Sequence, residues 1–191
     1  MKEHLITAFR FTIVTTIIFG LLYPLGLTGL SQLLFPAKAN GSLISVGGTI
    51  VGSSLIGQGF SADKYFHSRP SNAGTWYDAN ASGPSNLGPT NKQLTDRVHG
   101  DVLKIQQENP GQPIPIDLVT ASGSGLDPDI SPASAAFQVP RIAKTRNISP
   151  AQVNALILRH QQSRQFGILG EPRVNVLELN LELDAKYPIA Q

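Results

Sequence analysis

An apolar run extends from Phe11 to Ala37 near the start of the chain and contains no Asp, Glu, Lys or Arg. A helix rises ~1.5 Å per residue, so roughly 20 residues cross a hydrocarbon core of ~30 Å. The run therefore predicts one transmembrane helix at residues 11–36. The alternatives are a buried core helix and a cleaved signal peptide, for which Ala37-Lys38-Ala39 is a fitting cleavage site. A signal's apolar region, however, is usually only ~7–15 residues long.

Small residues recur every four positions along this predicted helix. Ala8, Thr12, Thr16 and Gly20 stack on one side of it. Small residues at this spacing let a second helix approach closely, and threonine hydroxyls can hydrogen-bond across the contact. We therefore predict that this face packs against partner helices, and that Pro24 is a site of kinking. The alternative is a plain membrane anchor in which the small residues are incidental.

Beyond the anchor, short patterned segments separated by turn residues predict one mixed α/β domain at residues 37–191, and hence an α+β chain. Two β-rich runs, Leu43–Val46 and Thr49–Val51, flank a pair of glycines and predict a hairpin. Residues 59–90 are rich in Gly, Ser, Asn and Pro and carry several aromatic residues. This composition predicts a long ordered loop, which is uncommon in a compact domain unless it has a function.

Periodic segments follow this loop. An apolar stripe with helical spacing begins after Pro89, and the apolar run Ile116–Thr120 predicts a buried strand. Capping signals at Ser131 and Ser149, each followed by proline, predict two further helices, the first of them interrupted at Pro140. Leucines alternate with polar residues over 174–183, which predicts a last strand, although leucine and glutamate also favour a helix.

Charge bears on the orientation of the chain and on its class. Lys2 and Arg10 precede the apolar run and only Lys38 follows closely, so the positive-inside rule predicts a cytoplasmic tail at residues 1–10 and an extracytoplasmic domain. The net charge of +2 is small and the basic residues are scattered, so nothing indicates a nucleic-acid partner. The sequence has no cysteine, which excludes disulfides and a thiol nucleophile.

Catalytic and metal-binding motifs are absent from the sequence. It contains no P-loop, no His-Glu-x-x-His and no Gly-x-Ser-x-Gly, so we predict no catalytic residue of its own and no metal site. One alternative is an anchored serine hydrolase, with Ser122 or Ser124 as nucleophile and His67, His99 or His160 as base. Another is a solute-binding module on a membrane tether.

Aromatic residues in the long loop are the remaining candidates for a contact. Tyr65, Phe66, Arg69, Trp76 and Tyr77 combine aromatic rings with one guanidinium group. We predict that they contact a partner protein, although Arg69 would serve equally well to close the loop on a backbone carbonyl.

Several blocks of the sequence, taken together and in order, resemble one family. They are residues 23–24 (YP), 39–44 (ANGSLI), 52–58 (GSSLIGQ), 65–71 (YFHSRPS), 85–88 (SNLG), 117–128 (DLVTASGSGLDP), 138–144 (QVPRIAK) and 174–181 (VNVLELNL). The family is the C subunit of the Kdp-type potassium-transporting ATPase. The blocks span nearly the whole chain, which makes the resemblance specific.

The resemblance implies an accessory role in a bacterial inner-membrane complex for potassium uptake. Its partners would be a channel-like potassium-binding subunit, a P-type subunit that hydrolyses ATP, a small accessory subunit and the bilayer. Such C subunits are described as catalytic chaperones that assist assembly and raise the ATP affinity of the pump subunit. The residues put forward for that role would fall on Ser122, Gly123, Ser124, Gly125 and Gln138.

This implied nucleotide role conflicts with the predicted topology. ATP is cytoplasmic, whereas the predicted domain lies in the periplasm and cannot touch the nucleotide directly. We therefore expect the chain to bind no cofactor of its own and to act on ATP indirectly, by favouring the nucleotide-competent state of the pump. In that case the glycine-rich turn is first of all structural.

Overall fold

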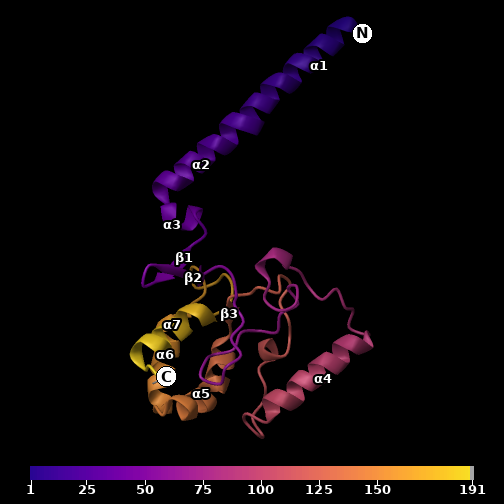
Figure 1. The fold of residues 1–191 in the computed structure, drawn as a ribbon. Coiled ribbons are helices and arrows are strands. Elements are labelled where there is room, and N and C mark those ends of the chain that lie inside the picture. Colours follow the sequence, from indigo (N-terminus) through magenta and orange to yellow (C-terminus); the bar gives the residue numbers. More distant parts are fainter. Residues whose placement is uncertain (190–191) are drawn as a thin grey trace. The chain divides into compact units, whose positions relative to one another are not determined.

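The chain divides into two compact units in the computed structural model, which describes residues 1–189 (Figure 1). The first unit, Met1–Val51, contains a long helix and most of a β-hairpin, and the second begins at Gly52 and holds the other elements. A long apolar helix is thus followed by a mixed domain of helices and small sheets, as the predicted α+β class requires.

One continuous helix runs from Lys2 to Leu34 and is long and apolar enough to cross a membrane. It consists of α1 (Lys2–Thr15), a π-helical stretch (Thr16–Leu22) and α2 (Tyr23–Leu34), and a short α3 (Pro36–Ala39) follows. The π-helical stretch ends two residues before Pro24, which has no N–H to donate to the preceding turn. The N–H of Tyr23 instead reaches back to the carbonyl of Ile18, which is the five-residue spacing of a π turn.

The predicted hairpin is confirmed as β1 (Leu43–Val46) and β2 (Thr49–Ser53). The turn residues Gly47 and Gly48 have φ values of 58° and 83°. Positive φ at both central positions is typical of a type I′ turn, which glycine adopts without steric cost.

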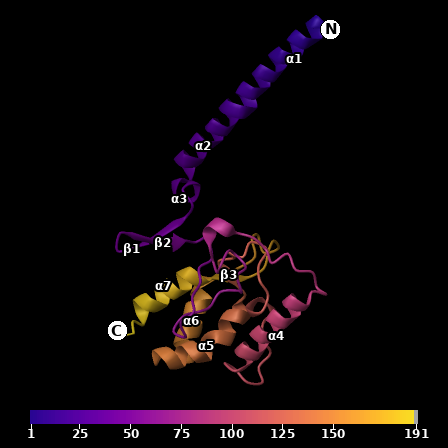
Figure 2. The same ribbon diagram turned by 45° about the vertical axis from the view of Figure 1, so that its right-hand side comes forward.

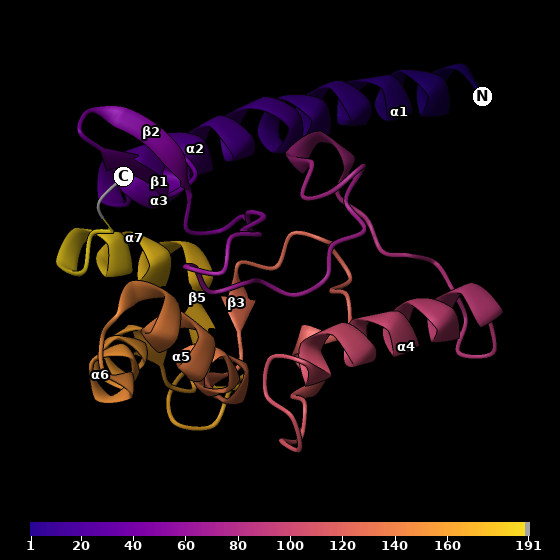
Figure 3. The ribbon, with the colours of Figure 1, turned by 60° about the horizontal axis from the view of Figure 1, so that its bottom comes forward.

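The second unit is built on a three-stranded antiparallel sheet with the strand order β3-β5-β4. Its elements are α4 (Lys92–Gln106), β3 (Asp129–Ile130), α5 (Pro132–Arg146), α6 (Pro150–His160), β4 (Gln161–Gln162), β5 (Arg173–Asn175) and α7 (Val176–Lys186), with 3-10 turns at Ala79–Ala81 and Ile116–Leu118. Figures 2 and 3 show α5, α6 and α7 gathered together, whereas α4 stands apart and is joined to them by coil.

The helix starts follow the predicted capping signals. The Ser131 hydroxyl accepts a hydrogen bond from the N–H of Ser134 at 3.0 Å, at the start of α5. Ser149 and Gln152 form a reciprocal capping box at the start of α6. Asp117 reinforces the first of these caps by accepting from the N–H of Ser131 at 2.8 Å. Burial alone would raise the pKa of Asp117, but hydrogen bonds from the two serines outweigh burial and hold its pKa below the usual value.

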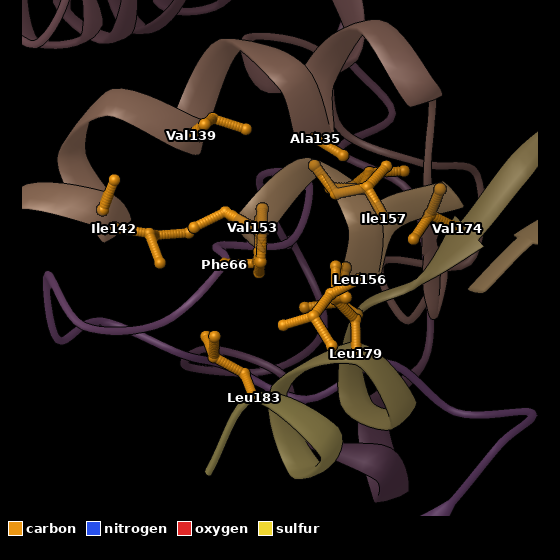
Figure 4. Packing of buried hydrophobic residues seen from close by; sticks show 13 residues of the cluster. Phe66, Ala135, Val139, Ile142, Val153, Leu156, Ile157, Val174, Leu179 and Leu183 are labelled. Atoms are coloured by element: carbon orange, nitrogen blue, oxygen red, sulfur yellow. The ribbon is translucent and has the colours of Figure 1, made fainter. Parts of the chain in front are cut away.

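The hydrophobic core lies between the small sheet and helices α5, α6 and α7. It includes Phe66, Ile130, Ala135, Val139, Ile142, Ala143, Val153, Leu156, Ile157, Val174, Val176, Leu179 and Leu183. Phe66 comes from the long loop, and Figure 4 shows its ring among side chains of the three helices. The loop is therefore anchored in the core at this residue.

The predicted strand at 174–183 is wrong beyond its first two residues. The chain is β5 only as far as Asn175, whose side chain accepts from the N–H of Glu178 at 3.1 Å and starts α7. The fully buried positions Val176, Leu179 and Leu183 have helical spacing. Tertiary packing on this stripe outweighs the period-two alternation of leucines.

Two further predictions are corrected. The run Ile116–Thr120 is not a strand: Ile116–Leu118 forms a 3-10 turn, and Ile116 is 75% exposed whereas Leu118 and Val119 are buried. Pro140 does not interrupt α5, which continues to Arg146. Both Pro140 and Ala136, whose carbonyl it leaves without a helical partner, are exposed, so water can satisfy that carbonyl while the opposite face stays packed.

Candidate functional site

The predicted helix face is accessible in the structure. Ala8, Thr12, Thr16 and Gly20 are all exposed. The hydroxyl of Thr12 donates to the carbonyl of Ala8 at 2.9 Å, within its own helix. A Cβ added at Gly20 would lie 3.6 Å from the nearest side-chain atom, on Thr16, which is an ordinary contact. The helix itself therefore has room for a larger residue at this position.

Two side-chain amides hold the backbone of the long loop as a strand partner would. The N–H of Phe66 donates to Asn180 Oδ1 at 2.8 Å, and Asn180 Nδ2 donates to the carbonyl of Phe66 at 2.9 Å. The next residue, His67, makes the same pair of bonds with Gln138, at 2.8 and 3.1 Å. Buried backbone groups need partners, and here helices α5 and α7 supply them.

Two arginines of α5 bind the loop carbonyls just before this pair. Arg141 donates to the carbonyls of Asp63 and Tyr65 at 2.6 and 3.0 Å. Arg146, whose side chain is fully buried, donates to the carbonyl of Lys64 at 2.7 Å and to Asp184 at 2.7 Å. We call Gln138, Asn180, Arg141 and Arg146 the loop clamp.

The loop clamp changes the interpretation of two predicted site residues. The Gln138 amide is only 2% exposed and is engaged at both ends, since Oε1 also accepts from Arg141 at 2.7 Å and Nε2 also donates to the Ser134 carbonyl at 3.3 Å. Phe66 is 0% exposed, so the prediction that it contacts a partner is wrong for the folded chain. Its ring is part of the core.

The other predicted contact residues lie at or near the domain surface. Arg69 bonds Asp127 at 2.8 Å and the Thr120 carbonyl at 3.3 Å, so it closes the loop on its own domain. The Tyr77 hydroxyl donates to the carbonyl of Arg69, and burial raises the pKa of Tyr77 to about 12.

The Tyr65 hydroxyl donates a hydrogen bond to Asp184 at 2.8 Å. Trp76 is the most exposed of the five predicted contact residues, at 51%. The Trp76 ring covers Gly59, where an added Cβ would lie within 2.8 Å of the ring. The same ring lines a hollow of about 350 Å³ between this loop and α4, together with His67, Arg69, Arg97 and Lys104. A small solute would fit such a volume, but Asp101 and Glu108 line it as well, so the charges around it are mixed.

The glycine-rich turn, Ser122 to Gly125, is packed against the loop by its backbone. Gly125 has φ +69° and is buried, and an added Cβ would lie 2.8 Å from the N of Ala73. The Ser124 carbonyl accepts from the N–H of Gly83 at 2.9 Å. Glycine is thus required here for close approach of two backbones. Gly123, in contrast, is exposed and has no neighbour within 4 Å of an added Cβ.

The serines of this turn are not joined to a histidine by any hydrogen bond in the described part of the chain. Ser122 and Ser124 lie 3.3 Å apart, hydroxyl to hydroxyl. The ring of His67 lies 3.2 Å from the Ala62 carbonyl, and that of His160 contacts Glu182. Burial and the nearby Arg141 lower the pKa of His67. Among residues 1–189, no group of three or more His, Asp or Glu side chains is placed to hold a metal ion.

Sequence reasoning missed most of the loop clamp. Of its members, only Gln138 is a predicted site residue. Asn180 escapes prediction because the period-two pattern of segment 174–183 predicts a strand, and Arg141 and Arg146 carry no local signal. In a strand Asn180 would belong to the polar face, whereas in α7 it shares the buried stripe with Val176 and Leu183. A polar residue at a buried helical position was the available signal.

Comparison with known proteins gives a consistent result. A family model described as "K+-transporting ATPase, c chain" matches residues 5–185. A potassium-transporting ATPase KdpC subunit from Koribacter versatilis is 56% identical over 189 residues, covering 99% of this chain and 98% of the relative. The corresponding subunits of Rhodospirillum rubrum and Caulobacter vibrioides are 55% and 52% identical, and each alignment covers at least 92% of both chains.

Proposed function

Because the chain belongs to the KdpC family, the c chain of K+-transporting ATPases, we propose that it assists assembly of that complex and raises the ATP affinity of the pump subunit. The chain is a non-catalytic subunit of the Kdp ATPase. The observation that carries the proposal is the family match over residues 5–185, which includes both the apolar helix and the folded domain.

The proposed partners are a P-type subunit that hydrolyses ATP, a channel-like subunit that binds potassium and a small accessory subunit. Residues 11–36 would cross the bacterial inner membrane once, with residues 1–10 in the cytoplasm and residues 37–191 in the periplasm. The helix Lys2–Leu34, which is long enough to span, and the positive charges before the apolar run support this arrangement.

The effect on ATP is proposed to be indirect. With the domain on the opposite side of the membrane from ATP, neither the Ser122–Gly125 turn nor Gln138 would meet the nucleotide. The engagement of the Gln138 amide within the loop clamp is consistent with this account, since none of its polar atoms is left without a bond. Binding of this subunit would favour the nucleotide-competent state of the pump, and ATP would in turn tighten subunit binding.

The proposed contacts are the Ala8, Thr12, Thr16 and Gly20 face in the membrane and Trp76 on the domain. The helix has no buried residue within its own chain, which leaves the whole face free for partner helices. Small residues allow close backbone approach in a bilayer, where apolar burial by itself does not drive helix association.

Two measurements test the proposal. The tagged full-length chain, extracted in mild detergent, should co-purify with a P-type ATPase chain and a polytopic channel-like chain. In complex prepared without this subunit, the KM for ATP should rise, by roughly 5-fold or more if the coupling lies in the usual range of ~1–3 kcal/mol. Recovery of this chain alone, under conditions that keep other membrane complexes whole, would contradict the assembly role. An unchanged KM would contradict the nucleotide role.

A further inference from the structure

The hairpin between β4 and β5 ends in an exposed apolar tip that no residue of the described range 1–189 covers. We call residues 164–171 the apolar finger. Its tip residues Phe166, Ile168 and Leu169 are 91%, 75% and 55% exposed. None of them belongs to the hydrophobic core. Single exposed apolar residues are ordinary on a protein surface, but three large ones on one tight turn form a patch.

The apolar finger is held in shape by its own bonds. Gln165 and Leu169 exchange two backbone hydrogen bonds of 2.8 and 2.9 Å. Arg164 donates to both carboxylate oxygens of Glu171, at 2.8 and 2.6 Å, and closes the base of the finger. The strands below it continue into the sheet, where the fully buried Val174 belongs to the core. The tip is therefore presented rigidly, and little ordering is needed when it binds.

The conformation of Phe166 is unusual for its residue type. Phe166 has φ +53° and Gly167 has φ +76°, and the N–H of Ile168 donates to the Gln165 carbonyl at 3.1 Å. Positive φ at both central positions is typical of a type I′ turn, where Asn, Asp and Gly prevail. A bulky aromatic in this region is strained, and strain of this kind concentrates at functional sites. Packing against the described part of the chain does not offset the strain, since Phe166 is almost fully exposed.

We propose that the apolar finger inserts into an apolar pocket on an extramembrane part of another subunit of the same complex. The proposal rests on the proposed function, because it requires a partner already joined to this chain. Three side chains of this size offer roughly 400 Å² at most, about half of the ~800 Å² per partner found in stable interfaces. A freely diffusing protein, including a second copy of this chain, would not be held by the finger alone. A subunit already joined to this chain through the membrane helix would be held, because tethering raises its effective concentration at the finger.

The surrounding charges favour a protein pocket over a lipid surface. Arg164 is paired with Glu171 at 2.6 Å. Arg159 and Arg173, on either side in the sequence, pair with Glu182 and Asp129, each at 2.9 Å. Arg164 and Arg173 each have a carboxylate of their own, and Arg159 shares Glu182 with Lys186 and His160. Attraction to anionic headgroups draws instead on unpaired basic residues beside the apolar tip. The finger thus combines an apolar tip with a neutral base.

Phe166→Asn tests this inference, because asparagine suits the turn but cannot fill an apolar pocket. The full-length chain carrying Phe166→Asn should keep or raise its midpoint of urea unfolding in detergent. It should retain its partner subunits at least about fivefold less well under stringent washing, as expected for loss of a buried aromatic anchor. The matched control is Ile116→Asn, which removes another largely exposed apolar side chain, at 75%, elsewhere on the domain and should change neither quantity.

The outcomes separate this inference from the proposed function. If the wild type retains its partners and Phe166→Asn retains them equally well, the inference about the apolar finger is overturned and the accessory role is unaffected. A lowered unfolding midpoint together with weaker retention would mean that Phe166 stabilises the chain itself, which also overturns it. Failure of the wild-type chain to retain any partner would overturn both. Equal losses of partner retention in Phe166→Asn and Ile116→Asn would show a general effect of surface apolar residues and would also overturn the inference of a specific pocket.

Discussion

The long loop around Phe66 and the apolar finger are both irregular segments with an aromatic residue. The ring of Phe66 is buried in the core, whereas that of Phe166 is exposed to solvent. The loop cannot satisfy its own backbone, and Gln138 and Asn180 bond Phe66 and His67 from the neighbouring helices. The finger satisfies its backbone within one turn and leaves Phe166 outside.

This difference shows that aromatic content alone does not identify a partner contact. A loop whose buried N–H and C=O groups are bonded by surrounding side chains is part of the core, and its apolar side chains can be buried there. A turn that makes its own backbone hydrogen bonds requires no partner from the rest of the domain. An exposed ring on such a turn therefore makes no stabilising contact with the domain. The free energy of unfolding of the domain separates the two cases, because a change at a buried ring lowers it and a change at an exposed ring does not.

The largest effect is expected from Phe66→Ala. Removing a fully buried phenylalanine leaves a cavity and should cost about 3–5 kcal/mol of unfolding free energy. Phe166→Ala, the same substitution in the finger, should change it by less than about 0.5 kcal/mol. Urea unfolding of the full-length chain in detergent can be followed by fluorescence of Trp76, the single tryptophan. Similar losses in both variants would remove the basis of the comparison.

Asn180→Leu should have the next largest effect. It keeps the side-chain size but leaves the buried N–H and C=O of Phe66 without partners, at a cost of about 2–4 kcal/mol. Asn154→Leu, at an exposed position of α6, is the matched control and should be nearly neutral. If the same unfolding assay finds Asn180→Leu as stable as its control, then the loop is not held by the clamp.

A smaller effect is expected from acidification, through His67. Burial and Arg141 lower its pKa in the folded chain, so the unfolded chain binds the proton more readily. The contribution of His67 to stability is fully present above pH ~6.5, the unperturbed value, and decreases as the pH falls towards the folded pKa. His67→Gln should therefore lose less stability than the wild type between pH 7 and pH 5. Parallel pH profiles of the two proteins would argue against a buried neutral histidine.

Gly20→Leu should leave the stability of the domain unchanged and act only on the complex. The larger side chain meets no obstacle within its own helix, but it would block close approach of a partner helix. We expect loss of co-purifying subunits with no shift of the urea midpoint. The control is Gly26→Leu, where an added Cβ also has open space but lies off the four-residue repeat. A complex that survives Gly20→Leu intact in detergent would disprove the packing face.

Local chemistry made much of the fold predictable. The apolar run, the two-glycine hairpin turn and the Ser131 and Ser149 caps depend on residues close in sequence, and each was identified from them. The structure of segment 174–183 was not identified in this way. Its leucines fit both the strand period of two and the helical period of 3.6, and only packing of α7 against the core decides between them. Pro140 likewise stays in a helix because its exposed face tolerates a missing bond.

The site was less predictable than the fold. The sequence identified the residues around Phe66 as a distinctive block, but their partners, Asn180 and Arg146, lie at least 80 residues further along the chain. Whether an aromatic ring points inwards is decided by such distant partners. The strain at Phe166 has no sequence signal beyond a Phe-Gly pair in a turn, because the sign of φ is visible only in the fold.

In the proposed complex the chain meets its partners through features that face outwards, and Phe166 is the most exposed of them on the domain. The direct test is to place a photo-activated benzophenone side chain at position 166 and, as the control, at position 116, in native membranes. The account predicts a polypeptide adduct with another subunit of the complex from position 166 and none from position 116. Adducts with lipid alone, or none at position 166 in a complex shown to be intact, would contradict it.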